Sequence, residues 1–188
     1  MQPLLFLVYL TTFTVNRMPY QTFATERLYL RPVAFEDDAF IFEVLNTPKF
    51  KKFVGDRQLR TVADARNYIK TKMHPQLERL GYSSYTVIRK EDGVKLGICG
   101  LYDREGLEGI DIGFSFLPQY EGQGYAFEAA NCIKEAAFND FGIKTLKAIT
   151  VKENLSSQKL IEKLGLKSLG TTTLPNDAEE LLLYSLSV

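Results

Sequence analysis

The sequence is poor in the residues that build metal centres and disulfides. Its 188 residues include one histidine, His74, and two cysteines, Cys99 and Cys132. His74 lies in a charged stretch beside Pro75, so we expect it on the surface, and a His-based metal centre or a Ser-His-Asp triad has little support. The cysteines lie in apolar surroundings without metal-ligand spacing. They indicate reduced core thiols, a cytoplasmic location and no metal.

The chain also lacks net charge and long apolar runs. Its 23 basic residues balance 23 acidic ones, so neither nucleic acid nor an anionic membrane is an expected partner. The N-terminal apolar run at 4–10 is far shorter than the ~20 residues of a membrane helix, and its flanks do not match a secretory signal. Residues 1–21 form an extension with two interpretations: a segment upstream of a true start at Met18, or an added edge strand or dimer contact.

The pattern of apolar residues predicts one domain over 22–188. We expect helices at 35–45, 61–78, 125 onward and 154–164, with a basic stretch at 49–60. Strands are expected at 26–31, 83–89, 95–102, 108–117, 145–151, 167–173 and 180–186. Since consecutive strands mostly follow one another, the fold class is α/β of the α+β type, with a mixed and mostly antiparallel sheet flanked by helices.

A glycine-rich segment lies between a predicted strand and a predicted helix. Residues 118–126 read Pro-Gln-Tyr-Glu-Gly-Gln-Gly-Tyr-Ala. Two glycines, Gly122 and Gly124, permit a sharp turn and leave backbone N–H groups uncovered, and the first N–H groups of a helix are unpaired as well. Such a junction binds phosphate without lysine or arginine. Phe127 breaks the dinucleotide-binding pattern, and no Gly-Lys-Ser/Thr follows, so NAD and ATP are disfavoured.

Three segments of the chain resemble the GNAT acetyltransferase superfamily, in particular its ribosomal-protein (RimJ/RimL-like) branch. They are residues 26–32, similar to the opening strand, 111–126, similar to the strand and pyrophosphate loop, and 154–165, similar to the second cofactor helix. The resemblance implies an acetyl-CoA-dependent N-acetyltransferase, in which two splayed central strands hold acetyl-CoA and a primary amine attacks it directly. It implies no metal, and a monomer or homodimer.

The resemblance also implies which residues bind acetyl-CoA. Backbone groups of β-strand residues would hold the pantetheine arm and the thioester, amides of the glycine loop would hold the pyrophosphate, and Asn154 would touch the pantetheine; in chain order these residues are Phe114, Phe116, Leu117, Gly122, Gln123, Gly124, Tyr125, Ala126 and Asn154. One departure concerns Glu121, which stands where the family has Gln or Arg. Its negative charge beside a pyrophosphate is unfavourable unless the side chain points outward, so weaker affinity for acetyl-CoA is expected.

Catalytic candidates come from the same resemblance. The tyrosine that many family members use as an acid is replaced by Ile161, and Ser157 stands where the branch has a serine proposed as the acid. Asn154 and Ser157 also fit a simple helix cap. Asp111, where the branch often has Glu, relays a proton through water or else is an outward strand residue. Glu179 and Glu180 are weaker candidates for the base.

The sequence leaves the acceptor and one rival function open. Without a strong base, α-amines or weakly basic amines are favoured over lysine, because they lose a proton more easily near neutral pH. The basic stretch at 49–60 favours acidic substrates or a cofactor phosphate, or is simply a solvated face. The rival function is a non-catalytic acyl-CoA-binding or sensing module of the same fold.

Overall fold

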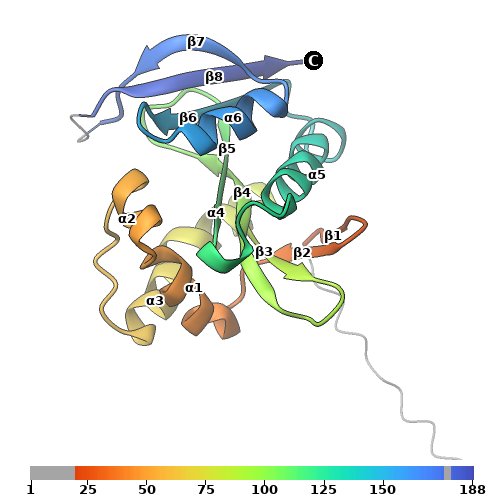
Figure 1. Ribbon diagram of the computed structural model, residues 1–188, viewed down its shortest axis with the longest axis vertical. Helices are drawn as coiled ribbons and strands as arrows, with labels where there is room; N and C mark the ends of the chain where they lie inside the picture. The colour runs from red at the N-terminus through yellow and green to blue at the C-terminus, as the bar shows by residue number, and fades with distance from the viewer. Residues whose placement is uncertain (1–19, 176–178) are drawn as a thin grey trace, which may run out of the picture.

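The computed structural model describes residues 20–175 and 179–188, so the interpretations of the first 19 residues lie outside the described part. The elements form one eight-stranded sheet in the order β1-β2-β3-β4-β5-β6-β8-β7 (Figure 1). The strands are β1 (Phe23–Ala24), β2 (Leu28–Pro32), β3 (Ser84–Arg89), β4 (Lys95–Asp103), β5 (Ile110–Phe116), β6 (Thr145–Val151), β7 (Lys167–Thr172) and β8 (Leu181–Ser187). The α-helices are α1 (Asp38–Leu45), α2 (Pro48–Phe53), α3 (Val62–Tyr68), α4 (His74–Leu80), α5 (Tyr125–Asn139) and α6 (Leu155–Lys163).

The sheet divides between β5 and β6. Every other neighbouring pair is antiparallel, whereas β5 and β6 are parallel and pair only at Ile110–Leu146 and Asp111–Lys147. Beyond these two pairs β5 continues along β4, while β6 continues along β8 through seven residue pairs. Figure 1 shows β5 linking the lower half of the molecule to the upper half that carries β6, β7 and β8. The predicted fold class and the splayed central strands are confirmed.

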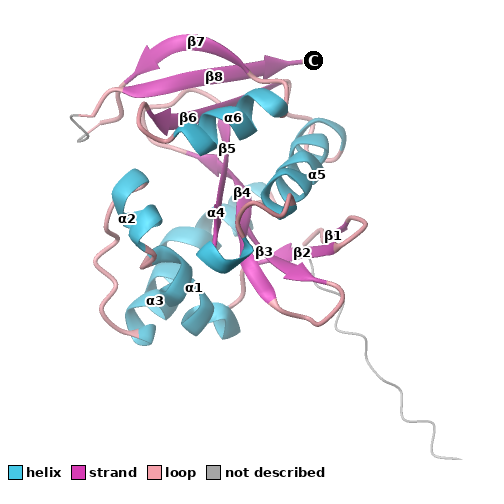
Figure 2. Cartoon of the chain, in the orientation of Figure 1, coloured by secondary structure: helices cyan, strands magenta, loops and turns pink. Residues whose placement is uncertain are grey.

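Helices cover both faces of the sheet (Figure 2). The small residues Ala129 and Ala130 and the side chain of Ile133 let α5 pack closely on one face, where β2, β3, β4, β5 and β6 supply other members of the cluster. On the opposite face, Ile41 and Val44 of α1 join Ile69 in a second cluster. Because each cluster is fully apolar and buried, the hydrophobic effect fixes both layers against the divided sheet.

A buried carboxylate joins the second layer to the sheet. Asp37 is fully buried and accepts hydrogen bonds from Arg31, Thr86 and the Ala34 amide, and it also pairs with Lys95 at 2.6 Å. Burial alone would raise the pKa of Asp37, but the bonds from Arg31, Ala34 and Lys95 outweigh it and lower the pKa to about 2. Asp37 is therefore a fixed anchor between this layer and the sheet.

Three local predictions differ from the structure. The basic stretch contains a helix, α2, which begins at Pro48 after the capping residue Thr47, a helix-start signal present in the sequence. The expected helix at 61–78 is divided into α3 and α4 by a π-helical turn, Ile69–Met73. His74 is half-buried rather than on the surface, since its ring stacks on Phe35 at 4.5 Å.

Candidate active site

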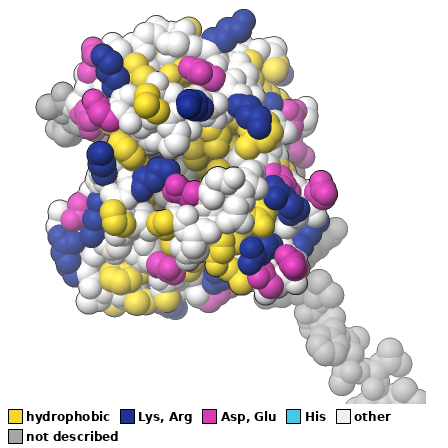
Figure 3. Space-filling view, in the orientation of Figure 1, with side chains coloured by type: hydrophobic (Ala, Val, Ile, Leu, Met, Phe, Trp, Pro, Cys, Tyr) yellow, Lys and Arg dark blue, Asp and Glu magenta, His cyan; other side chains and the backbone are white. Residues whose placement is uncertain are grey.

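A cavity of about 790 Å³ lies where β5 and β6 separate. Both strands line it, together with α2 and the residues that follow it, the π-helical turn and the start of α6. Figure 3 shows hydrophobic side chains in the hollow between the half with α6 and the half with α1 to α3, and Lys and Arg side chains over α2. The divided sheet therefore opens onto a space large enough for the arm of a cofactor and a small acceptor.

The edge of β5 that faces this cavity presents free backbone groups. The Leu117 amide donates to the Leu96 carbonyl of β4, and the Leu117 carbonyl accepts from Tyr120. Since backbone groups alternate in direction along an antiparallel strand, those of Phe114 and Phe116 point away from β4, toward the gap left by β6. Phe114 and Phe116 are thus placed as expected, whereas both backbone groups of Leu117 are already occupied.

The loop before α5 presents a row of unpaired amides. Gly122 and Gly124 have φ of +72° and +83°, a left-handed conformation that glycine adopts without steric cost. Within the described residues, no protein acceptor lies in hydrogen-bond reach of the amides of residues 122–127, and the Glu128 amide is the first that bonds back, to the Gly124 carbonyl. These N–H groups lie at the positive end of a 15-residue helix, an arrangement that favours an anion.

Arg27 and Glu128 hold this loop in place. Arg27 donates to the Gln123 carbonyl at 3.1 Å, and its guanidinium lies 4.4 Å from the centre of the Tyr125 ring. Glu128 accepts from the Nε of Arg27 at 2.7 Å, from the Arg27 amide and from the Thr25 hydroxyl. The charge of Arg27 is thus paired, and its side chain fixes the geometry of the loop.

Glu121 points to a partner rather than into the loop. Its Oε2 lies 2.8 Å from the Nζ of Lys49, and both side chains are well exposed. Lys49 compensates the negative charge of Glu121, so we expect Glu121 to weaken acetyl-CoA binding only slightly. The size of the effect should be that of a surface ion pair. Lys49 was seen in the sequence only as one member of a basic stretch.

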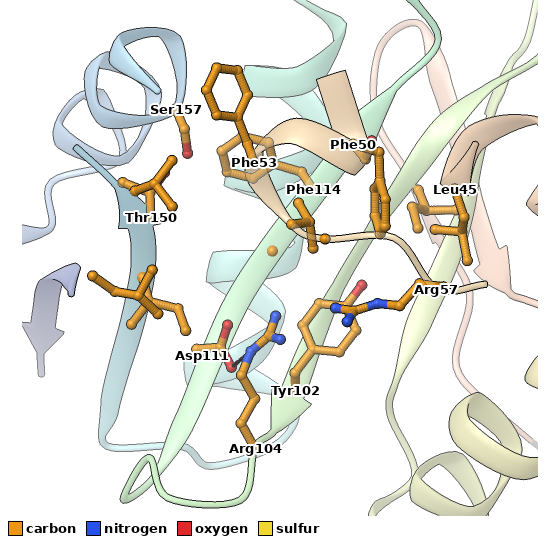
Figure 4. Close-up of a pocket in the computed structure, with 18 of the residues that line it drawn as sticks. Leu45, Phe50, Phe53, Arg57, Tyr102, Arg104, Asp111, Phe114, Thr150 and Ser157 are labelled. Atoms are coloured by element: carbon orange, nitrogen blue, oxygen red, sulfur yellow. Dashed lines mark hydrogen bonds and ion pairs between the residues drawn. The ribbon is translucent and has the colours of Figure 1, made fainter. Parts of the chain in front are cut away.

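The start of α6 places Asn154 and Ser157 at the cavity. The Oδ1 of Asn154 accepts from the Ser157 amide at 3.2 Å, so the helix-cap interpretation is correct. Both residues also line the cavity, and Figure 4 shows the Ser157 hydroxyl pointing into it. No group among the described residues hydrogen-bonds that hydroxyl. Asn154 therefore caps the helix through the Ser157 amide, while the Ser157 hydroxyl stays free at the cavity.

Asp111 lies on the wall of the cavity and is not an outward strand residue. It is almost fully buried, and its Oδ1 accepts from the Nε of Arg104 at 2.7 Å. Burial raises the pKa of Asp111, while the charge of Arg104 and its hydrogen bond oppose that rise. Oδ2 has no hydrogen-bond partner among the described residues, which leaves it available to a water or a substrate.

Of three further side chains at the cavity, Arg104 and Tyr102 were not identified from the sequence, and Arg57 was noted only as one member of the basic stretch. Arg104 holds Asp111, the Tyr102 ring lies 5.0 Å from the Arg104 guanidinium, and Arg57 enters from the segment after α2 (Figure 4). Burial raises the pKa of Tyr102, whose hydroxyl is hydrogen-bonded to Ser84 at 2.9 Å. Tyr102 and Arg104 lie together at the end of β4, and only the folded chain brings Arg57 to them.

Residues 20–175 and 179–188 contain neither a cluster of metal ligands nor a membrane-spanning helix. No group of three or more His, Cys, Asp or Glu residues is arranged to hold a metal ion. No helix in this part of the chain has the length and apolar character needed to cross a membrane.

A model of the acetyltransferase (GNAT) domain matches residues 27–167 of this chain. The chain belongs to the GNAT acetyltransferase family. Among curated proteins, this GNAT acetyltransferase is similar to the uncharacterized N-acetyltransferase YnaD of Bacillus subtilis, with 26% identity over 78% of this chain and 82% of the relative. It is likewise similar to the uncharacterized N-acetyltransferase p20 of Bacillus licheniformis, with 27% identity over 80% and 84%. The chain is an N-acetyltransferase, as expected.

Solved structures show the same fold. An acetyltransferase from Agrobacterium tumefaciens superposes with a TM-score of 0.76 and 22% identity, covering 100% of this GNAT acetyltransferase and 99% of that chain. A structure described as a ribosomal-protein-serine acetyltransferase, from Vibrio cholerae, gives 0.74 and 16% over 90% and 99%. The microcin C7 self-immunity acetyltransferase MccE, solved with acetyl-CoA and AMP, gives 0.73 and 14% over 87% and 94%.

Proposed function

We propose that this protein transfers the acetyl group of acetyl-CoA to a primary amine by direct attack in a ternary complex. The observation that carries the proposal is the row of unpaired amides at 122–127, next to the gap between β5 and β6. Five of the proposed cofactor residues, Gly122 to Ala126, belong to this row. Phe114 and Phe116 on the free edge of β5, and Asn154 opposite, would hold the pantetheine arm.

The residues present fit acetyl-CoA. The amides of the loop suit a pyrophosphate, because they can bind its charge without a basic side chain. The loop also lies close to Arg27, since a Cβ atom at Gly124 would come within 3.2 Å of the guanidinium. When bound, acetyl-CoA supplies a thioester whose carbonyl carbon is attacked by the amine. We propose that the Phe116 N–H, on the free edge of β5, polarises the carbonyl oxygen.

Two side chains would move the protons. As the C–N bond forms and the C–S bond breaks, the Ser157 hydroxyl gives a proton to the leaving sulfur. The neutral amine loses one proton as it attacks, and the Oδ2 of Asp111 accepts it directly or through water. That proton then returns through water to the Ser157 oxygen, so both side chains regain their starting protonation. A raised pKa makes Asp111 a better base near neutral pH, and Arg104 keeps it oriented.

An α-amine or another weakly basic amine suits this site. Deprotonating an amine of pKa ~7.8 at pH 7 costs about 1 kcal/mol, whereas a lysine of pKa ~10.4 costs roughly 4.6 kcal/mol. The acceptors of the RimJ/RimL-like branch, protein α-amines, belong to the first group. Assignment to that branch, the domain limits of 22–188 and a cytoplasmic location all stay predictions.

The test combines binding and turnover. Calorimetric titration should show micromolar binding of acetyl-CoA and none of NADH or ATP, and CoA release should depend on an added amine. Binding without release for any amine would favour the non-catalytic alternative, for which the described residues and the relatives offer no support. Absence of binding would contradict the proposal as a whole.

A further inference from the structure

Arg57 forms no hydrogen bond and no ion pair with the residues that the structure describes. Its Nε is buried without a hydrogen-bond acceptor, and no carboxylate among the described residues forms an ion pair with its guanidinium. Its cation–π contact with Phe50 is weak, since the guanidinium carbon lies 5.9 Å from the centre of the ring. A buried donor on a charged group is costly when it is left unpaired, so an unpaired arginine beside a cavity indicates a ligand.

The carboxylate nearest to Arg57 in sequence, that of Asp56, is occupied by other partners. Asp56 accepts from the Gln58 amide at 2.8 Å through Oδ1, and its Oδ2 pairs with Arg60 at 3.3 Å. Gln58 has φ of +59°, a conformation that is uncommon for a residue with a side chain. In this turn Arg60 is exposed and paired, whereas Arg57 points into the cavity (Figure 4).

The cavity wall around Arg57 is basic. Lys51, Lys52 and Lys72 line the same cavity, and none of them forms an ion pair with a described residue. Of the acidic residues that line it, Asp111 is occupied by Arg104, while Glu105 and Glu179 are exposed. The charged lining residues that α2, the segment after it and the π-helical turn contribute are all basic. This wall lies apart from the loop amides proposed to hold the pyrophosphate.

We propose that the amine acceptor carries an anionic oxygen group, a carboxylate or a phosphate, and that Arg57 binds this group. The inference rests on the proposed acetyl transfer and specifies its substrate class. A guanidinium offers paired N–H donors that match the two oxygens of either group, and the lysines raise the local concentration of anions. One end of the acceptor is thereby fixed while its amine is directed at the thioester.

The test uses four peptide amides in two matched pairs. Glutamyl- and glutaminyl-alaninamide differ by one carboxylate, and phosphoseryl- and seryl-alaninamide differ by one phosphate. The wild-type enzyme should favour one or both charged members by about 10-fold to 100-fold in kcat/KM. Arg57→Gln should remove this preference, and Arg57→Lys should retain part of it, since the charge remains but the paired donors are lost.

Arg60→Gln is the matched control. It removes an arginine from the same turn that lies outside the cavity lining and is already paired, so the preference should stay at the wild-type level. Equal use of charged and neutral members by the wild-type enzyme, or identical behaviour of the Arg57 and Arg60 variants, would overturn the inference while leaving acetyl transfer intact.

A binding arm decides the matter if no peptide is acetylated. Glutarate and inorganic phosphate are titrated into the wild-type protein and into Arg57→Gln in the presence of CoA. At least one anion should bind the wild type and bind the variant about 10-fold more weakly. If neither anion binds the wild type, the inference is wrong, whereas loss of acetyl-CoA binding itself would contradict the proposed function instead.

Discussion

The start of α5 and the wall of the cavity beside α2 present positive charge in different ways. At the α5 end, the amides of residues 122–127 face outward from a helix start, and the nearby Arg27 is engaged with Glu128 and the Gln123 carbonyl. At the α2 end, the charge comes from side chains, chiefly Arg57. Backbone amides bind the same group whatever the side chains are, so this end suits a constant cofactor. Side chains vary freely in evolution, so the other end suits a specific acceptor.

Removal of the Ser157 hydroxyl should lower the rate of acetyl transfer more than any other change considered below. Ser157→Ala should lower kcat about 100-fold, because the leaving sulfur loses its proton donor, while the Kd of acetyl-CoA stays the same. Steady-state kinetics and calorimetry measure the two quantities.

Ser156→Ala is the control for this variant. Ser156 precedes Ser157 on the same helix turn and bonds to the same Asn154 oxygen, but it is exposed and does not line the cavity. If both serine variants keep full turnover, Ser157 is only part of a helix cap.

Gly124→Ala should weaken acetyl-CoA binding about 5-fold to 30-fold. A side chain at φ of +83° costs about 1–2 kcal/mol, and relief of that strain moves the amides out of line. Gly142→Ala is the control, since Gly142 has φ of +66° and open space around it but lies beyond the end of α5. Both variants should lose thermal stability, and only the first should bind acetyl-CoA more weakly in calorimetry.

Asp111→Asn should lower kcat/KM about 10-fold at pH 7, a modest loss because an α-amine costs only about 1 kcal/mol to deprotonate. In the acidic limb of the pH–rate profile Asp111 and the substrate amine each gain a proton, and the variant should keep only the limb of the amine. Asp103→Asn serves as the control, because Asp103 pairs with Arg79 at the surface. An acidic limb of unchanged slope in Asp111→Asn would assign the base elsewhere.

The smallest effect is expected at Lys49. Lys49→Gln should raise the Kd of acetyl-CoA about 2-fold to 3-fold, because the Glu121 carboxylate then faces the cofactor phosphates uncompensated. The double variant with Glu121→Gln should restore the wild-type Kd. High salt should reduce the difference, since both side chains are well exposed. A large effect at low and high salt alike would mean that Lys49 touches the cofactor itself.

The same contrast explains what the sequence could predict. The α5 end was predictable because its information is local: Gly122 and Gly124 stand between an alternating strand and a helical repeat, and the resulting fold is confirmed. The α2 end was not, because Arg57 lies more than 40 residues before Tyr102 and Arg104 and meets them only through packing. Nor does any sequence pattern distinguish Lys49 and Arg60, which pair with acidic neighbours, from Arg57, which does not.

Amide hydrogen exchange with and without acetyl-CoA tests the central claim most directly. Binding should slow exchange at residues 122–127, whose N–H groups have no protein acceptor, and at Phe114 and Phe116 on the free edge of β5. The Leu117 amide, already bonded to Leu96, and residues 57–60 should change little. If acetyl-CoA leaves the exchange of 122–127 unchanged, the α5 loop does not hold the cofactor, and the proposed site is wrong.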